Sequence, residues 1–159
     1  MVMFPDYSYD HQAGSAPFYV CREGKLLKVR NFGARLKVKK WWPPCEGEVW
    51  IIRMGIENHG LWIWDSGEKC EISTDSMTCV LAYRRLIRGG FSNSVWVAYF
   101  LSAIAQVPCY VAHKLGLNHP GDYDSRNTIP FDLPDRKCHV CNFAFQESGL
   151  SMQELLYKE

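Results

Sequence analysis

The chain has 159 residues, of which 47% are hydrophobic and 22% are charged, and its formal net charge is +1. This length predicts one domain, and the apolar content is sufficient for a packed core, which excludes a disordered chain. The near-neutral charge excludes a global field that would attract nucleic acid. The longest apolar run, 95–112, is interrupted by polar residues and a proline, so we expect no membrane span.

The seven cysteines are odd in number and irregularly spaced, and no apolar signal segment precedes them. This pattern is typical of reduced thiols rather than of a disulfide framework. We therefore expect a cytosolic protein.

In the first part of the chain, residues 1–17 show no periodicity and predict an extended N-terminal arm. Apolar runs then predict strands at 18–21 and 26–29, and alternation of apolar and charged residues predicts a third strand at 35–39.

In the middle of the chain, apolar stretches at 49–54 and 61–64 flank the turn-like residues 55–58. This pattern predicts an antiparallel hairpin, followed by a short strand at 70–73.

A helix is then predicted from Thr74 or Asp75, either of which can cap it, to Gly89-Gly90. A second helix is predicted over 94–106, followed by a strand at 109–112 and a loop as far as Pro134. The order of elements predicts an α+β domain over 18–146, with an antiparallel sheet packed against two or three helices. Residues 147–159 carry a capping-box pattern and predict a C-terminal helical tail.

The segment 47–73, GEVWIIRMGIENHGLWIWDSGEKCEIS, places His59 at the expected start of a strand directly after a loop. It resembles the H-box of the permuted papain-like superfamily, which includes lecithin:retinol acyltransferase and NlpC-type peptidases. In that family the histidine is general base or acid for a cysteine at a helix N-terminus, where the thiol pKa is lowered. The resemblance implies that role for His59, and Glu71 or Cys70 lies at the spacing of the residue that orients the imidazole.

The second motif of that family is Asn-Cys at the start of an apolar helix, and this chain has Asn93-Ser94 instead. A serine has a far higher pKa than a thiol, so the replacement predicts loss of thiol catalysis by this route. Cys79, near the start of the preceding helix, is the alternative nucleophile. His59, Cys79 and Ser94 can also be a turn residue, a core residue and a helix cap.

Within the superfamily, the chain resembles the small picornavirus 2A proteins of the H-box/NC type over about 47–106. The resemblance implies a viral accessory protein that has the enzyme fold without being the viral protease. It further implies action through host proteins or viral genome replication, in the host cytoplasm or in both cytoplasm and nucleus.

Two thiols, Cys138 and Cys141, are separated by two residues and can hold one zinc ion from a single turn. A pair is only half of such a site, so ordinary reduced cysteines remain the alternative to a structural zinc. We expect no other cofactor. Residues that could complete the site are Cys45, Cys109, His113 and His119.

The segment 22–42 is strongly basic and ends in two tryptophans. Cations beside aromatic rings are suited to phosphate contact and base stacking, so the segment is a candidate for RNA binding, although a solvated strand face gives the same pattern. The candidate residues are Lys25, Lys28, Arg30, Arg35, Lys37, Lys39, Lys40, Trp41 and Trp42.

Three functions are therefore open. The first is a catalytically degenerate interaction protein with His59 and Ser94 at the old active site. The second is an active thiol acyltransferase or hydrolase that uses Cys79 and His59, oriented by Glu71. The third is an RNA-binding module built on residues 22–42.

Overall fold

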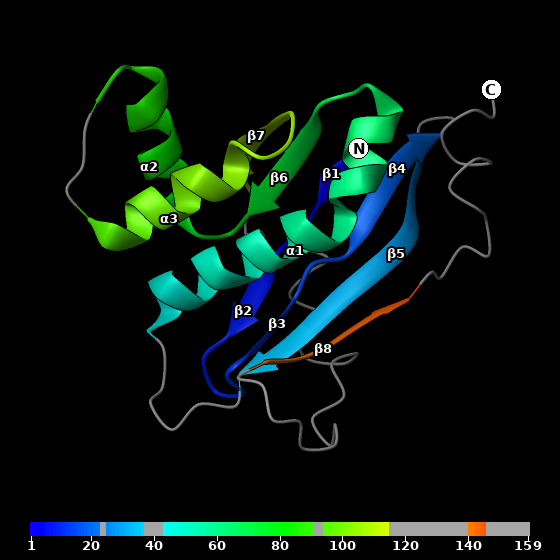
Figure 1. The fold of residues 1–159 in the computed structure, drawn as a ribbon, viewed down its shortest axis with the longest axis horizontal. Helices are drawn as coiled ribbons and strands as arrows, with labels where there is room; N and C mark the ends of the chain where they lie inside the picture. Colours follow the sequence, from blue (N-terminus) through cyan, green and yellow to red (C-terminus); the bar gives the residue numbers. More distant parts are fainter. Residues whose placement is uncertain (23–24, 37–42, 91–93, 115–139, 146–159) are drawn as a thin grey trace.

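The computed structural model describes residues 1–22, 25–36, 43–90, 94–114 and 140–145. These residues form an eight-stranded mixed sheet with three helices, which confirms the predicted α+β class. The strand order is β2-β3-β5-β4-β1-β6-β7, and β8 pairs with the free edge of β5 (Figure 1).

The strands before the first helix form an antiparallel unit, and β5 pairs with both β3 and β4. Residues 1–17 are therefore part of the sheet and not the extended arm that composition predicted. Proline-containing breaks at Phe4-Pro5 and Ala16-Pro17 hid these short strands. The strands are β1 (Val2–Met3), β2 (Asp6–Ser8), β3 (Ala13–Ser15), β4 (Phe18–Arg22) and β5 (Lys25–Leu36).

The second half of the domain adds parallel strands through helical connections. β6 pairs with β1 in parallel, and β7 pairs with β6 in parallel, so the sheet is not wholly antiparallel as predicted. The elements are α1 (Pro44–Ser66), β6 (Cys70–Thr74), α2 (Met77–Ile87), α3 (Val95–Ile104), β7 (Cys109–His113) and the edge strand β8 (Val140–Phe145).

The predicted hairpin at 49–54 and 61–64 is wrong, because both stretches belong to the single helix α1. Buried residues recur along α1 at helical spacing, as Val49, Ile52, Ile56, His59 and Ile63. Short apolar runs rich in Ile and Trp fit a strand locally. Here the burial of one continuous helical face outweighs that preference.

The strands predicted separately at 26–29 and 35–39 are wrong in part, because 26–29 and 35–36 belong to the single strand β5, and residues 37–39 lie outside the described part. β4, β6, α2, α3 and β7 occur close to their predicted positions, although the N-cap of α2 is Ser76, whose side chain accepts a hydrogen bond from the backbone N–H of Cys79. Asp75, one of the two predicted caps, is left outside the helix.

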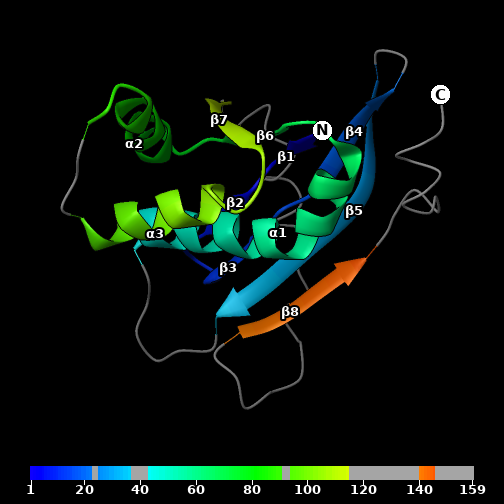
Figure 2. The same cartoon turned by 45° about the horizontal axis from the view of Figure 1, so that its top comes forward.

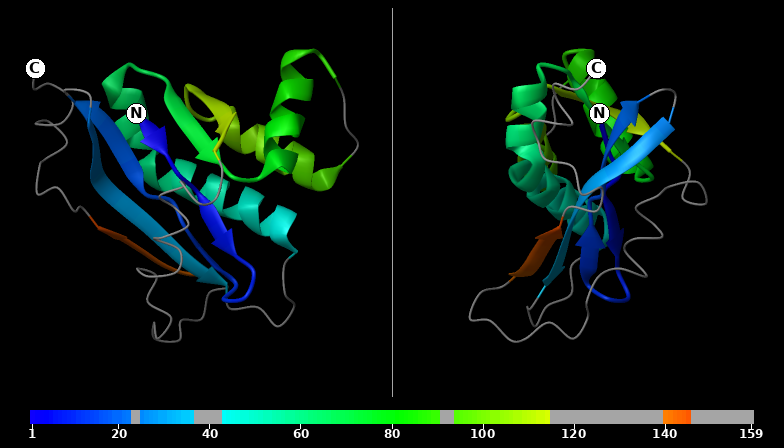
Figure 3. Two further views of the ribbon diagram at one scale, coloured as in Figure 1. Left: turned by 180° about the vertical axis from the view of Figure 1, so that it is seen from behind. Right: turned by 90° about the vertical axis from the view of Figure 1, so that its right-hand side faces the viewer.

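The main core lies between the sheet and the helices, which cover one face of it. α3 runs beside α1 (Figure 2), and the view from behind shows the strands in front of α1 (Figure 3). Fully buried side chains include Phe18, Ile52, Ile72 and Phe100. In the part of the chain described, no helix combines the length and apolarity needed to cross a bilayer.

Candidate metal centre

Three carboxylates from separate parts of the sequence meet near the start of α1. Asp6 begins β2, Glu48 lies in the second turn of α1, and Asp75 directly follows β6. One oxygen from each residue lies within 4.8 Å of the other two. Asp6 and Glu48 are buried, and Asp75 is half-buried.

The pairing of two parallel strands brings Asp6 to Asp75. β1 pairs with β6 so that Val2 is opposite Glu71 and Met3 is opposite Ile72. Asp6 lies three residues after Met3, and Asp75 lies three residues after Ile72. Both carboxylates therefore follow the same end of the parallel strand pair.

A glycine lets α1 bring Glu48 to the same point. Gly47 lies against the ring of Tyr7, and a Cβ at this position would overlap that ring. This close approach allows the backbone N–H of Tyr7 to donate to Oε1 of Glu48 at 3.1 Å. The contact fixes one carboxylate oxygen and leaves the other for a ligand.

Glu48 is an energetically costly residue in this position. It is 8% exposed, and in the described part of the chain its Oε2 has no hydrogen-bond partner. Burial raises the pKa of its carboxyl well above the usual value, and the negative charges of Asp6 and Asp75 raise it further, while the hydrogen bond from Tyr7 opposes the shift. A cation among the three carboxylates would remove this penalty.

The donor set fits a hard divalent cation. Carboxylate oxygens are preferred by Mg²⁺, Mn²⁺ and Ca²⁺, whereas zinc sites usually contain His or Cys. Octahedral Mg²⁺ holds oxygens at about 2.1 Å, so neighbouring ligands are about 3.0 Å apart and opposite ligands about 4.2 Å apart. The three carboxylate oxygens, which lie within 4.8 Å of one another, would therefore move closer together to bind one ion.

Cys79 lies close to the carboxylates but is not an activated thiol. It is fully buried in the first turn of α2, and burial raises its pKa to about 12, with Glu48 and Asp75 adding to the shift. An enzyme with Cys79 as nucleophile requires the opposite shift. The environment therefore contradicts the expectation of a low-pKa Cys79.

His59 lies inside α1 and not at the start of a strand, so the expected H-box geometry is absent. Its Nε2 hydrogen-bonds the carbonyl oxygen of Ala16 at 2.7 Å, its ring stacks on Phe18, and its Nδ1 has no partner. Burial lowers its pKa to about 3. His59 is a neutral core residue, and neither ring nitrogen contacts Cys79.

The remaining residues of the expected thiol site are dispersed. Glu71 accepts a hydrogen bond from the Tyr110 hydroxyl at 3.3 Å on the exposed surface. Ser94 is the N-cap residue of α3. The structure thus does not assemble His59, Glu71, Cys79 and Ser94 into one site.

The basic segment is described only in part. The guanidinium of Arg30 donates to Oδ1 of Asn58 at 3.1 Å and lies 5.4 Å from the ring centre of Trp62, so this cation is engaged internally. Lys28 and Arg35 also have interactions within the protein. The side chain of Lys25 and residues 37–42, which include Lys37, Lys39, Lys40, Trp41 and Trp42, lie outside the described part.

The predicted zinc pair is not tested either. Cys138 lies outside the described residues, as does the expected helical tail 147–159. Cys141 is placed only as a backbone position in β8, opposite Arg35.

Sequence reasoning missed the acidic cluster. Asp75 follows a short strand and precedes a helix, which is a position where ligand-binding residues commonly occur. Helix capping explains that signal equally well. Asp6 carries no signal because nothing in the sequence marks its segment as a strand, and Glu48 lies directly before the stretch 49–54, which predicts a strand of the hairpin.

The chain was also compared with known proteins. No protein-family model matches it, and no curated protein matches it.

Proposed function

We propose that this domain is a metal-dependent nuclease, in which Asp6, Glu48 and Asp75 hold Mg²⁺ or Mn²⁺ at the reacting phosphodiester. One observation carries the proposal: three carboxylates converge, and the buried Oε2 of Glu48 has no hydrogen-bond partner among the residues that the structure describes. Evolution tolerates such a costly arrangement mainly where a ligand offsets it.

The topology supports the same function. Taken in chain order, the extended runs are 2–8, 13–22, 25–36, β6 and β7, and their order across the sheet is third, second, first, fourth and fifth. The first, fourth and fifth runs are parallel where they pair. Ligand-binding residues commonly follow the carboxyl ends of parallel strands, and Asp75 lies at such an end. Topology alone assigns no activity, so the argument depends on the carboxylates.

The proposed reaction is hydrolysis. A water oxygen forms a bond to phosphorus and gives up a proton, one P–O ester bond breaks, and the leaving oxygen takes up a proton to become a hydroxyl. The three carboxylates would hold the divalent metal, which would supply charge stabilisation and activate water. The hydrogen bond from Tyr7 keeps Glu48 oriented.

The test is cleavage of end-labelled oligonucleotides by the full chain, using single-stranded and duplex DNA, single-stranded RNA and an RNA–DNA hybrid. We expect cleavage of at least one substrate with Mg²⁺ or Mn²⁺ and none with EDTA. The variants Asp6→Asn, Glu48→Gln and Asp75→Asn should each lose it. Asp65→Asn is the matched control, because Asp65 is an exposed acid at the far end of α1.

Two results would reject the proposal. One is a wild-type chain that cleaves none of the four substrates with either metal. The other is cleavage that survives all three ligand substitutions. Metal-dependent stabilisation without cleavage would assign the cluster to a structural cation site instead.

The thiol-enzyme alternative is less well supported, because the buried Cys79 has a raised pKa. In the folded protein we expect Cys79 to be alkylated more slowly than the half-buried Cys45. Fast alkylation of Cys79 that depends on His59 would restore that alternative. RNA binding by residues 22–42 stays a prediction, and it is compatible with a nuclease.

A further inference from the structure

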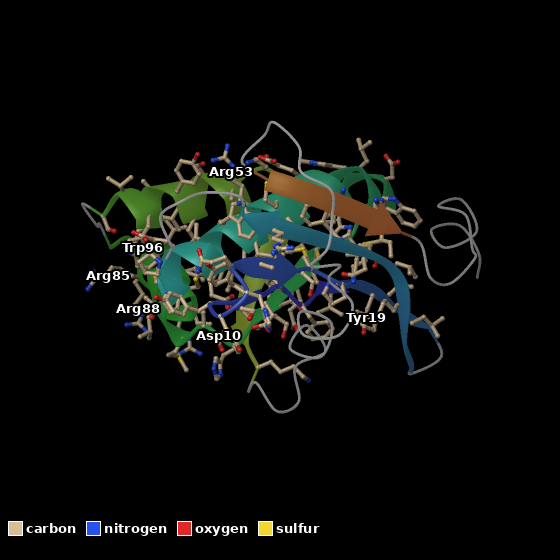
Figure 4. The ribbon with its side chains drawn as sticks, turned by 90° about the horizontal axis from the view of Figure 1, so that it is seen from below. Asp10, Tyr19, Arg53, Arg85, Arg88 and Trp96 are labelled. Atoms are coloured by element: carbon tan, nitrogen blue, oxygen red, sulfur yellow. The ribbon has the colours of Figure 1, made fainter. Side chains whose placement is uncertain are left out.

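A hollow of about 690 Å³ lies between α2 and α3, outside the carboxylate cluster. One wall is α2 from Thr78 to its end and the glycines that follow, and the other is α3 as far as Leu101. Arg85, Arg88 and Trp96 are seen at this end of the molecule (Figure 4). The hollow is therefore a surface feature of the two helices that follow Asp75.

The charge of this hollow has one sign. Arg84, Arg85 and Arg88 line it, and none of its described lining residues is acidic. All three arginines are exposed, and none forms a salt bridge with a residue that the structure describes. Guanidinium groups bind phosphate through paired N–H donors, so three unpaired ones around a cavity favour a ligand with several phosphates.

The end of α2 holds Arg85 in a defined position. Gly89 has a positive φ of 76°, and the N–H of Gly90 donates to the carbonyl oxygen of Arg85 at 2.8 Å. A Cβ at Gly90 would overlap the stem of the Arg85 side chain. The two glycines therefore end the helix and leave room for that side chain.

The spacing from the metal centre suits a polymer and not a single phosphate. α2 starts two residues after Asp75, and Arg84 and Arg88 lie about 12 Å and about 18 Å along its axis from Ser76. A single phosphate group cannot reach both the carboxylates and the end of α2, whereas a polymer of phosphates can.

We propose that this arginine hollow binds the phosphate backbone of the nucleic acid several nucleotides from the cleaved bond. The proposal rests on the proposed nuclease function for its orientation. The binding itself can be measured without cleavage, so the two can fail separately.

The experiment is fluorescence anisotropy of a labelled duplex and a labelled RNA–DNA hybrid with the full chain in EDTA, repeated at several salt concentrations. Replacing Arg84, Arg85 and Arg88 together by Gln should lower the salt slope by two to three and the affinity by at least about tenfold, since each lost phosphate contact removes about 0.9 from the slope. Replacing all three by Lys should restore most of the slope. Lys69→Gln, an exposed charge beyond the far end of α1, is the matched control and should change the affinity less than twofold.

An unchanged slope in the Gln variant would overturn the proposal, as would an equal loss in Lys69→Gln. Competition by millimolar inorganic phosphate as effective as that by the oligonucleotide would also overturn it, because the hollow would then bind small anions only. If the wild type binds through the arginines but never cleaves, the hollow stands and the nuclease proposal fails. If the wild type cleaves and the Gln variant has an unchanged KM, the nuclease proposal stands and the proposal for the hollow fails.

Discussion

Two buried polar residues of the same helix, Glu48 and His59, have opposite surroundings. Glu48 lies in a cluster with two other carboxylates, whose charges oppose its ionisation. His59 stacks on Phe18, bonds a backbone carbonyl and stays neutral. Burial of either side chain costs free energy. Only Glu48 lies beside two other carboxylates, and a single cation would offset the repulsion among the three.

This difference shows what makes a buried polar group a functional candidate. Burial alone selected both residues, and sequence motifs selected only His59. Several carboxylate oxygens converge at Glu48 but not at His59, so only Glu48 is a candidate functional residue. Measurements on variants of the two residues test this distinction.

The largest expected effect is on catalysis. Glu48→Gln should lower kcat/KM for the preferred substrate by at least about 100-fold, because a metal ligand acting on the transition state contributes several kcal/mol. His59→Leu should stay within a few-fold at a temperature where circular dichroism shows both variants folded. Equal losses in the two variants would erase the distinction between the residues.

The second effect is the pH dependence of stability that His59 causes. Its folded pKa of about 3 lies below the value of about 6.5 expected in the unfolded chain, so protons favour the unfolded state as pH falls through this window. Between pH 7 and pH 5, this histidine should cost about 2 kcal/mol of unfolding free energy. Urea unfolding of wild type and His59→Leu at both pH values isolates this contribution, since Glu48 is common to both. Parallel pH profiles would show that His59 is not buried as described.

A third effect concerns the approach of α1 to β2. Gly47→Ala should cost about 1–3 kcal/mol and weaken metal binding, because its Cβ would overlap the Tyr7 ring and push Glu48 away. Gly60→Ala in the same helix is the matched control. The nearest atom to its Cβ is Cγ1 of Val107 at 3.6 Å, an ordinary contact, so helix propensity predicts a gain of up to about 1 kcal/mol. Thermal unfolding measures the stability of both variants. Similar stability changes in the two would argue against the close approach at Gly47.

The smallest effect is on the metal-free protein. The raised pKa of Glu48 means that its contribution to stability is present at low pH and is lost as pH rises above about 4.5 and through the folded pKa. Glu48→Gln should therefore stabilise the protein in EDTA near neutral pH, by on the order of 1 kcal/mol. Added Mg²⁺ should stabilise the wild type and not the variant. A variant less stable than the wild type in EDTA would show that the cluster carries no repulsion.

Part of this molecule could be predicted from its sequence. β6, α2, α3 and β7 followed from caps, glycines and apolar spacing, because each is decided mainly by local chemistry. α1 was not recognised, since its Trp and Ile runs resemble strands until the buried stripe is followed over the whole helix.

The candidate site could not be predicted for a different reason. It depends on the register between β1 and β6 and on the contact between Gly47 and Tyr7, two long-range pairings with no local signature. The histidine motif, by contrast, was local and conspicuous, and the structure places it in the core.

Metal binding by the carboxylate cluster is the claim on which the account depends most. Isothermal titration of the full chain with Mn²⁺ and Mg²⁺, compared with Asp6→Asn and Glu48→Gln, measures it directly. The account predicts saturable binding by the wild type and a loss of at least about tenfold in affinity in each variant. Absence of binding, or equal binding by wild type and variants, would contradict it.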